Sequence, residues 1–291
     1  MKWSLPAKTF LLGEYAAVAE ASALVLTTSP CFELSLIDHK GLSGIHPESP
    51  AGLWWQQQKY SDFGLIWHDP YEGCGGLGAS SAQFLGSYLA ACHLLDKTPD
   101  MRDMLENYYK VSWSGKGLRP SGYDVIAQSQ QGCVYINKHH KIVQSYAWPF
   151  DDLSFFLIHT GVKLATHHHL QDTTLPESID SLSALVDEAK LSFELSNSTQ
   201  FLATINQYHQ KLVELNRVAD HSLRLINTLK EYPEVRAIKG CGALGADIIL
   251  LMTSRTDSLM LHKSLTAQGL TVLATEKNLF IQSQLSQITS L

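Results

Sequence analysis

The sequence of 291 residues lacks the features that mark several large classes of protein. It has no uninterrupted apolar run of the roughly 20 residues needed to cross a bilayer. Its start, MKWSLPAKTFLLGEY, has a proline, a second lysine and a glutamate where a signal peptide would have an unbroken apolar region. A formal charge of -6 gives no overall basic field for nucleic acid or acidic lipid. These absences favour a chain without nucleic-acid or membrane partners that acts on a small molecule.

Cysteine is scarce, and its spacing excludes further classes of protein. The five cysteines are odd in number and never spaced as C-x-x-C, which argues against both a disulfide framework and a zinc site. We therefore expect a reducing, cytoplasmic location. The hydrophobic content of 45% is that of a folded globular protein, and the length favours two domains.

Patterns typical of strands and of helices alternate along the chain. Strands are expected within residues 8–29, at 31–38, as a hairpin over 132–148, at 153–161, in the apolar run 247–253 and at 271–275 and 279–283. Helices are expected after Gly78 to about Asp96, over 101–112, near 125–130, over most of 178–231 and over 256–270, whereas residues 50–70 are aromatic and irregular. The pattern shifts near Pro149, so the predicted domains are 1–149 and 150–291.

Two glycine clusters are near-copies of one another. GCGGLGASSAQF begins at Gly73, and GCGALGADIILLM begins at Gly240. Both satisfy G-x-G-x-x-G. Neither has the other features of a dinucleotide fingerprint, which are a strand before the loop, a helix after it and an acidic residue at the end of the next strand. A Walker A loop is excluded as well, because Ala79 and Ser80 stand where lysine and its hydroxyl partner should be.

A more general property remains, since a glycine turn before a helix presents backbone N–H groups to an anion. We therefore expect both loops to close on the same phosphates. Ser80 and Ser81 lie where the helix after the first loop begins, and their spacing is compatible with helix capping as well as with contact to phosphate or a metal ion.

Four ordered segments carry a family resemblance: PAKTFLLGEYA from Pro6, GLGASSAQF from Gly76, SGYDVIAQSQQG from Ser121 and KGCGALGAD from Lys239. Together they resemble the GHMP kinases, the family of galactokinase, homoserine kinase, mevalonate kinase and phosphomevalonate kinase. The similarity spans nearly the whole chain. It implies an α+β fold of two domains, an N-terminal ribosomal-protein-S5-like domain and a C-terminal ferredoxin-like domain, with the active site in the cleft between them.

The resemblance also implies a site and its ligands, ATP and Mg²⁺. Asp124 is the expected base for the acceptor hydroxyl, and Lys8 is expected to stabilise the transferring phosphoryl group; in isolation, either residue also suits an ordinary structural role, a helix N-cap for Asp124 and a surface lysine for Lys8. The residues expected to bind the nucleotide are Gly73, Gly75, Gly76, Leu77, Gly78, Ala79, Ser80 and Ser81, with Ser80 or Ser81 on the metal. The residues expected to bind the acceptor are Glu14, Tyr15, Lys116, Arg119, Ser121, Gly122, Lys239 and Gly242.

The choice of acceptor depends on finer similarities. The segment WSGKGLRPSGYDV looks more like phosphomevalonate kinases. Mevalonate kinases usually have histidine where this chain has Tyr15, and a magnesium-binding glutamate near the position of Trp113, where this chain has none. Lys116 and Arg119 suit an acceptor that already carries a phosphate, or are solvated loop charges. Phosphomevalonate is the expected acceptor, mevalonate the alternative, and a diphosphomevalonate decarboxylase remains open.

A non-catalytic sensor of a nucleotide or metabolite also remains open. The C-terminal motif has Leu244 and Ala246 where the family prefers glycine, and Asp247 would repel phosphates unless a cation lay between them. The run His167-His168-His169 is expected to be a polar stretch rather than a metal site, because consecutive residues rarely converge on one ion. A monomer or a homodimer is expected.

Overall fold

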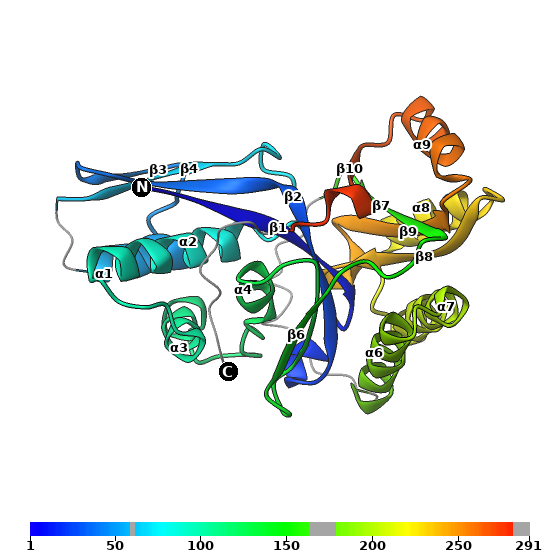
Figure 1. The fold of residues 1–291 in the computed structure, drawn as a ribbon, viewed down its shortest axis with the longest axis horizontal. Helices are drawn as coiled ribbons and strands as arrows, with labels where there is room; N and C mark the ends of the chain where they lie inside the picture. Colours follow the sequence, from blue (N-terminus) through cyan, green and yellow to red (C-terminus); the bar gives the residue numbers. More distant parts are fainter. Residues whose placement is uncertain (59–61, 163–178, 282–291) are drawn as a thin grey trace.

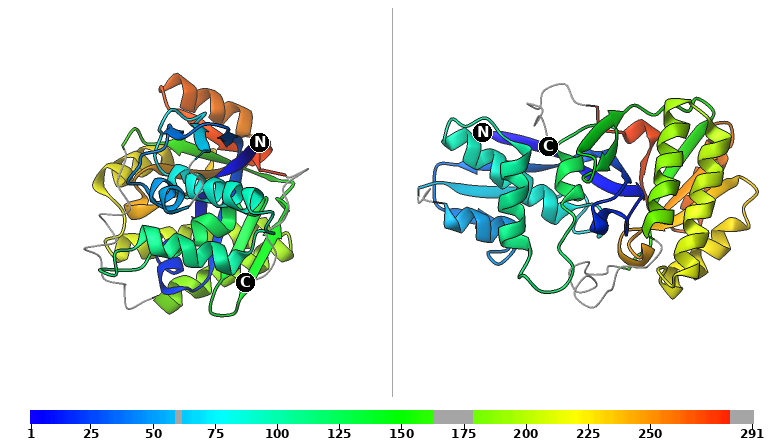
Figure 2. Two further views of the ribbon diagram at one scale, coloured as in Figure 1. Left: turned by 90° about the vertical axis from the view of Figure 1, so that its left-hand side faces the viewer. Right: turned by 90° about the horizontal axis from the view of Figure 1, so that it is seen from below.

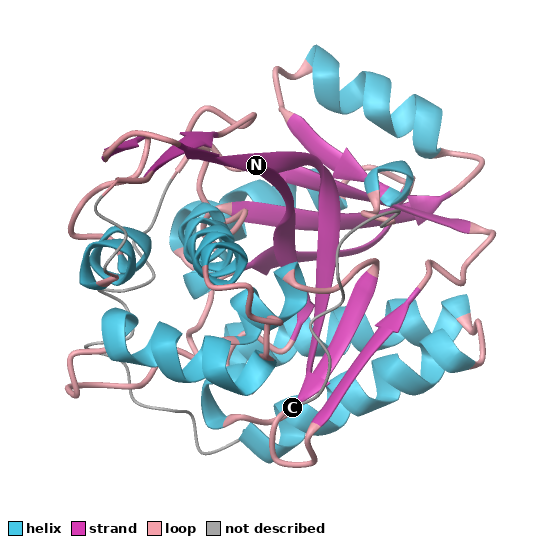
Figure 3. Ribbon diagram, turned by 60° about the vertical axis from the view of Figure 1, so that its left-hand side comes forward, coloured by secondary structure: helices cyan, strands magenta, loops and turns pink. Residues whose placement is uncertain are grey.

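The structure is a computed structural model that describes residues 1–58, 62–162 and 179–281. It is an α+β protein with two β-sheets and helices packed on them (Figures 1 and 3). The first sheet has the order β3-β4-β2-β5-β6, and β1 pairs with β2 beside this path. Its strands are β1 (Lys2–Leu12), β2 (Ala23–Ile37), β3 (Gly41–Ser43), β4 (Gly64–His68), β5 (Cys133–Asn137) and β6 (Ile142–Tyr146).

Strand β2 organises the first sheet. Its 15 residues pair with β1 along most of their length, with β5 at their start, over Ala23–Leu26, and with β4 near their end. The helices of this half are α1 (Pro50–Gln57), α2 (Ala79–Leu94), α3 (Met101–Ser112) and α4 (Tyr123–Gln128). Both α2 and α4 pack on β1 and β2. Small or apolar residues lie on nearly every side of α2, so this helix is buried around most of its circumference and its start is firmly placed.

The second sheet is antiparallel, with the order β10-β7-β9-β8. Its strands are β7 (Leu153–His159), β8 (Val235–Cys241), β9 (Ile248–Ser254) and β10 (Val272–Thr275). Its helices are α6 (Ile179–Glu194), α7 (Ser198–Glu214), α8 (Asp220–Lys230) and α9 (Ser258–Ala267). The helices α7 and α8 pack against β8, and α9 packs against β9 and β10. The two halves of the chain lie side by side (Figure 2).

Most expected elements are present, and three expectations are wrong. Of the strand expected at 279–283, the described residues form only an isolated bridge between Leu279 and Thr28. Residues 50–70 are not irregular, because they form α1 and β4. Lys239 and Gly240 do not open a loop, since both lie inside strand β8. Short 3-10 turns, η1 (Ala17–Ala19), η2 (Ala243–Gly245) and η3 (Glu276–Asn278), complete the described elements. No helix among the described residues has the length and apolar character to cross a membrane.

The chain passes from one sheet to the other between Tyr146 and Leu153. Residues of the second half of the chain also contact the first sheet. The last described residues return to the first sheet, where the Phe280 N–H donates to the Thr27 carbonyl at 2.9 Å. Helix α6 is tied to the same sheet, because the Ser22 hydroxyl donates to Asp187 Oδ1 at 2.6 Å. The domain boundary at 149/150 therefore stays a prediction, because the last described residues follow the second sheet in the sequence but contact the first sheet.

An aromatic cluster fills the space between β7 and the helices α6 and α7. Phe201 stacks on Phe150 with ring centroids 4.8 Å apart and lies 5.0 Å from Phe193. Trp148 covers the same group, 6.0 Å from Phe201. Aromatic side chains bury large apolar areas and favour such stacked and edge-on contacts. This cluster is therefore a main source of stability in the second half.

Phe201→Ala is expected to lower the free energy of unfolding by about 3–5 kcal/mol, because it leaves a cavity inside this cluster. Urea denaturation followed by circular dichroism measures the change. Leu195→Ala, at a side chain 66% exposed, serves as the control and should change it by no more than about 0.5 kcal/mol. Equal effects of the two substitutions would contradict the assignment.

Candidate active site

An ion pair between Lys8 and Asp124 lies at the centre of the candidate site. Lys8 is on β1, and Asp124 is in the first turn of α4. Lys8 Nζ lies 3.0 Å from Asp124 Oδ2, and the side chains are 10% and 34% exposed. The structure thus brings together two motifs that are far apart in the sequence. The lysine is buried, while its carboxylate partner remains partly open to a ligand.

The loop before α2 has a row of unused backbone donors. The N–H groups from Gly75 to Ser81 donate to no acceptor in the described part of the chain. They lead into a helix of 16 residues, whose N-terminus carries a partial positive charge. Gly73 differs, because its N–H donates to Asp69 Oδ2 at 3.0 Å and helps to shape the start of the loop. The segment Gly75–Ser81 can therefore bind a chain of phosphates, and Gly73 is revised to a structural role.

Gly78 allows this loop to lie directly on Lys8. Its φ is 79°, and a Cβ here would lie 2.7 Å from Lys8 Cγ. In addition, the Lys8 N–H donates to the Leu77 carbonyl at 2.9 Å. No side chain could occupy position 78 without displacing the lysine. The loop and the ion pair are therefore parts of one site.

Gln128, at the end of α4, joins three of the motifs. Its amide nitrogen donates to the carbonyls of Pro6 at 2.9 Å and Gly78 at 3.0 Å. Its amide oxygen accepts from the Ser81 hydroxyl at 2.7 Å. The Ser81 hydroxyl is therefore buried and already used within the protein, whereas Ser80 is exposed and its hydroxyl contacts no described residue. Of the two serines predicted to bind Mg²⁺, Ser80 is the one open to a ligand.

The two glycine loops touch each other. At Gly76, with φ 81°, a Cβ would lie 2.7 Å from Asp247 Cβ and 2.7 Å from Ile248 Cγ1. Asp247 is only 2% exposed. The second loop and the start of β9 thus pack on the backbone of the first loop. That both loops bind the same phosphates stays a prediction.

A second ion pair, between Glu14 and Lys239, connects the same regions. Glu14 follows β1 and Lys239 lies on β8, with side chains that are 5% and 0% exposed. Burial alone would lower the pKa of Lys239, but the neighbouring Cys241 sulfur and Glu14 carboxylate raise it. Both residues were expected to bind the acceptor. Because they are buried and bound to each other, we revise that expectation to a structural role.

Tyr15 also contacts the second loop rather than an acceptor. Its hydroxyl accepts from the Leu244 N–H at 3.3 Å, and burial raises its pKa to about 12. Leu244 has a left-handed φ of 53°, and its carbonyl accepts from the Ala219 N–H at 2.8 Å. Leucine is thus held in a conformation that favours glycine. Gly242 supports the same turn, because its carbonyl accepts from the Gly245 N–H at 3.0 Å.

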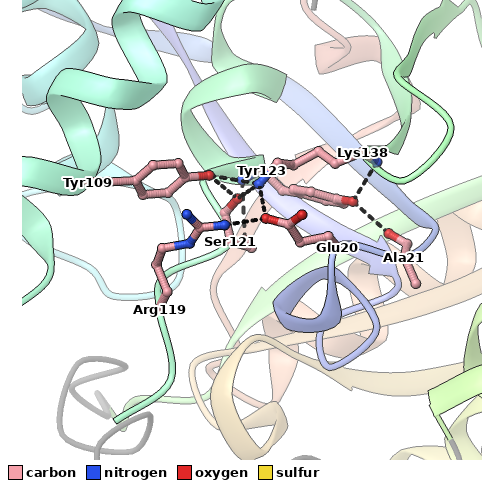
Figure 4. A network of polar contacts seen from close by, with 7 residues as sticks. All are labelled: Glu20, Ala21, Tyr109, Arg119, Ser121, Tyr123 and Lys138. Carbon is pink, nitrogen blue, oxygen red and sulfur yellow. Dashed lines mark hydrogen bonds and ion pairs between the residues drawn. The ribbon is translucent and has the colours of Figure 1, made fainter. Parts of the chain in front are cut away.

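The residues before Asp124 form the other side of the site (Figure 4). Gly122 caps α4 in a left-handed conformation, and the Ser121 hydroxyl accepts from the Tyr123 N–H at 3.2 Å. Arg119 Nη2 lies 2.5 Å from Glu20 Oε1, and the arginine side chain is 43% exposed. Lys116 is exposed and forms no ion pair with the described residues. Arg119 is therefore held in place by Glu20, whereas Lys116 is not held by an ion pair with the described residues, and acceptor binding by either cation stays a prediction.

Other residues discussed above lie outside the site or the described residues. His167, His168 and His169 fall in the segment that the structure does not describe. No group of three or more His, Cys, Asp or Glu side chains suited to a metal ion occurs among the described residues. Mg²⁺ in nucleotide sites does not need such a cage, since it keeps several waters and takes most other ligands from the phosphates. The exposed Ser80 hydroxyl beside the free N–H groups fits a metal held in that way.

Solved structures of similar shape belong to small-molecule kinases. The mevalonate kinase of Methanococcus jannaschii superposes with a TM-score of 0.72, at 14% identity over 97% of this chain and 98% of that one. The phosphomevalonate kinase of Streptococcus pneumoniae gives 0.76, at 14% identity over 94% and 98%. The galactokinase of Lactococcus lactis gives 0.70, at 11% identity over 93% and 92%.

The chain has the fold of the GHMP kinases. No protein-family model matches it. No curated protein sequence matches it either. At this level of identity, the fold is what the similarity shows, and the site has to be argued from its own geometry.

Sequence reasoning missed several residues of this GHMP-fold site. Gln128 stands inside a recognised motif, but nothing in its spacing shows that it bonds to Pro6 and Gly78. Glu20, Tyr109 and Lys138 lie outside all four motifs, and only the folded chain brings them to the segment before Asp124 (Figure 4). A polar residue that bonds across the fold leaves no local pattern for sequence reasoning to detect.

Gly76→Ala is expected to push the two glycine loops apart, because the new methyl group would clash with Asp247 and Ile248. Isothermal titration calorimetry with AMPPNP and Mg²⁺ should show affinity weakened by about tenfold or more, about 1.4 kcal/mol. Gly269→Ala is the control, since its φ of 75° brings the same backbone strain while a Cβ there meets nothing within 4 Å. Unchanged affinity in Gly76→Ala would count against a shared site.

Lys239→Met is expected to lower the free energy of unfolding by about 3–5 kcal/mol, because it leaves the Glu14 carboxylate buried without its cation. The double variant Glu14→Leu with Lys239→Met should recover most of that loss, since no buried charge remains. Chemical denaturation of the wild type, Glu14→Leu, Lys239→Met and the double variant gives the coupling free energy between the two side chains. Additive effects would contradict a direct buried pair.

Proposed function

We propose that this chain is an ATP-dependent kinase that phosphorylates a small-molecule hydroxyl group, with phosphomevalonate as the preferred acceptor. The observation that carries the proposal is the Lys8–Asp124 pair beside the free N–H groups of Gly75–Ser81. Phosphoryl transfer needs positioning and charge stabilisation around the γ-phosphate more than covalent chemistry from the protein. The site contains groups suited to both tasks.

Each group has a role in this reaction. The N–H groups of the first glycine loop and the N-terminus of α2 bind the phosphates of ATP. Asp124 accepts the proton of the acceptor hydroxyl as its oxygen bonds to the γ-phosphorus and the bond to ADP breaks. Lys8 stabilises the negative charge on the transferring phosphoryl group. When bound, Mg²⁺ neutralises charge on the phosphates, and Ser80 is the residue placed to hold it.

The preference for phosphomevalonate is supported by Arg119. Its guanidinium carbon lies 4.5 Å from the centroid of the Tyr109 ring, so the planar group is held on an aromatic face while part of it stays exposed. Arginine binds phosphate in a bidentate manner. A solved structure of the same fold, the phosphomevalonate kinase of Streptococcus pneumoniae, is a complex with phosphomevalonate and AMPPNP. Mevalonate is the alternative acceptor, and it carries no phosphate group for Arg119 to bind.

A non-catalytic sensor on the same fold is the second candidate. It is favoured by the second glycine loop, where the Leu244 backbone bonds to Tyr15 and Ala219. Such a sensor would bind a nucleotide at the first loop without turnover. A cytoplasmic location and a monomeric or homodimeric state complete the proposal.

Asp124→Asn is expected to lower kcat by about 10²–10⁴-fold with ATP binding retained, because the amide cannot accept the proton. A coupled ADP-release assay with Mg²⁺ and a panel of phosphomevalonate, mevalonate, diphosphomevalonate, homoserine and galactose measures the rate. Asp38→Asn, at an exposed position away from the site, is the control and should match the wild type. Full activity in Asp124→Asn would overturn the assigned base, and ATP binding without turnover on any acceptor would favour the sensor.

A further inference from the structure

A buried ammonium group outside the four motifs lies next to the segment that carries Asp124. Lys138 follows β5, and its side chain is only 11% exposed. Its Nζ donates to Glu20 Oε1 at 2.7 Å, to the Tyr109 hydroxyl at 2.8 Å and to the Ser121 carbonyl at 3.3 Å (Figure 4). An ammonium has three donors. All three are used within the protein, so Lys138 has none left for a substrate.

This lysine and its partners hold each of the three residues before Asp124. The Ser121 carbonyl accepts from both Lys138 and the Tyr109 hydroxyl, the latter at 2.8 Å. Gly122 lies so close to Tyr109 that a Cβ there would be 2.7 Å from its hydroxyl oxygen. The Tyr123 hydroxyl donates to the Ala21 carbonyl at 2.7 Å and accepts from the backbone N–H of Lys138 at 3.0 Å. The segment therefore has little freedom to move.

Glu20 compensates the buried charge and connects it to Arg119. Burial would raise the pKa of Glu20, but its hydrogen bond and charge contact with Lys138, together with the charge of Arg119, lower it overall. The carboxylate is therefore ionised near neutral pH and binds both cations through Oε1. The centroid of the Tyr109 ring lies 5.2 Å from Lys138 Nζ, with the Tyr109 hydroxyl between them. Charge and hydrogen bonds together hold Lys138 in one place.

We propose that Lys138 is a positioning residue, whose ammonium holds the Ser121 carbonyl and the Tyr109 hydroxyl that lies against Gly122, and so keeps Asp124 in line with Lys8. The effect on catalysis that follows from this inference rests on the proposed function. Helix α4 has only six residues, so its own hydrogen bonds anchor its first turn weakly. The placement of the Asp124 carboxylate thus depends on the network before it. A displacement of about 1 Å at such a group can lower a rate by about a hundredfold.

The test compares Lys138→Met, Lys138→Arg and Lys141→Met. Lys141 lies in the same turn with an exposed side chain, which makes its substitution the matched control. Two quantities are measured. One is the hydrogen exchange of the backbone amides of Tyr123 and Ile126, which donate to the Ser121 hydroxyl and to the Gly122 carbonyl. The other is the separate values of kcat and of KM for ATP. We expect Lys138→Met to speed the exchange at least tenfold and to lower kcat by about 10–100-fold, with KM for ATP within about twofold of the wild type. Lys138→Arg should bring the exchange rate and kcat part of the way back to the wild-type values, and Lys141→Met should change neither the exchange rate nor kcat.

The two readouts keep this inference separate from the proposed function. If the wild type shows no kinase activity, the proposed function fails, and hydrogen exchange alone decides whether Lys138 orders the segment. Exchange in Lys138→Met equal to that of the wild type would overturn the proposal. So would faster exchange with unchanged kcat, because Asp124 would then not depend on the segment. A uniform rise in exchange over the whole chain, with ATP affinity and kcat falling together, would show general destabilisation and also overturn it.

Discussion

The buried ion pair between Glu14 and Lys239 determines how the two halves of the chain meet. Two charged groups out of contact with water are stable only when paired at close range, so this contact tolerates little displacement. Glu14 lies near the end of the first motif, and Lys239 opens the C-terminal motif. Pairing them sets the end of β1 against β8. Tyr15 follows Glu14 and contacts Leu244, and Gly76 packs against Asp247 of the C-terminal motif.

The remaining contacts of the site follow from that junction and from the first sheet. Strand β1 carries Lys8, and the phosphate loop packs on it through Gly78. Gln128 then joins the loop to α4, and the network around Lys138 holds the segment before Asp124. The protein thus uses its buried polar groups to position a small number of groups for a ligand. These are the N–H groups of Gly75–Ser81, which have no acceptor among the described residues, the exposed Ser80 hydroxyl, the Asp124 carboxylate and part of Arg119.

The sequence predicted the fold well because long elements have clear periodicity. The helix over Met101–Ser112 and the hairpin of β5 and β6 are found where expected. Residues 50–70 were misjudged, since α1 is short and bears tryptophans whose burial depends on α2 and α3. Lys8, Asp124 and the first glycine loop were identified from motifs, and the structure places them together. The motifs did not show that Glu14 pairs with Lys239 or that Tyr15 bonds to Leu244, because a motif does not show whether a side chain points to a ligand or to another motif.

A crystal structure with AMPPNP, Mg²⁺ and phosphomevalonate tests the central claim most directly, namely that the joined glycine loops and the Lys8–Asp124 pair form one phosphoryl-transfer site. The account predicts phosphate oxygens on the N–H groups of Gly75–Ser81. It also predicts the γ-phosphate beside Lys8, with the acceptor hydroxyl within hydrogen-bonding distance of Asp124. A nucleotide bound elsewhere, or an acceptor oriented away from Asp124, would contradict it.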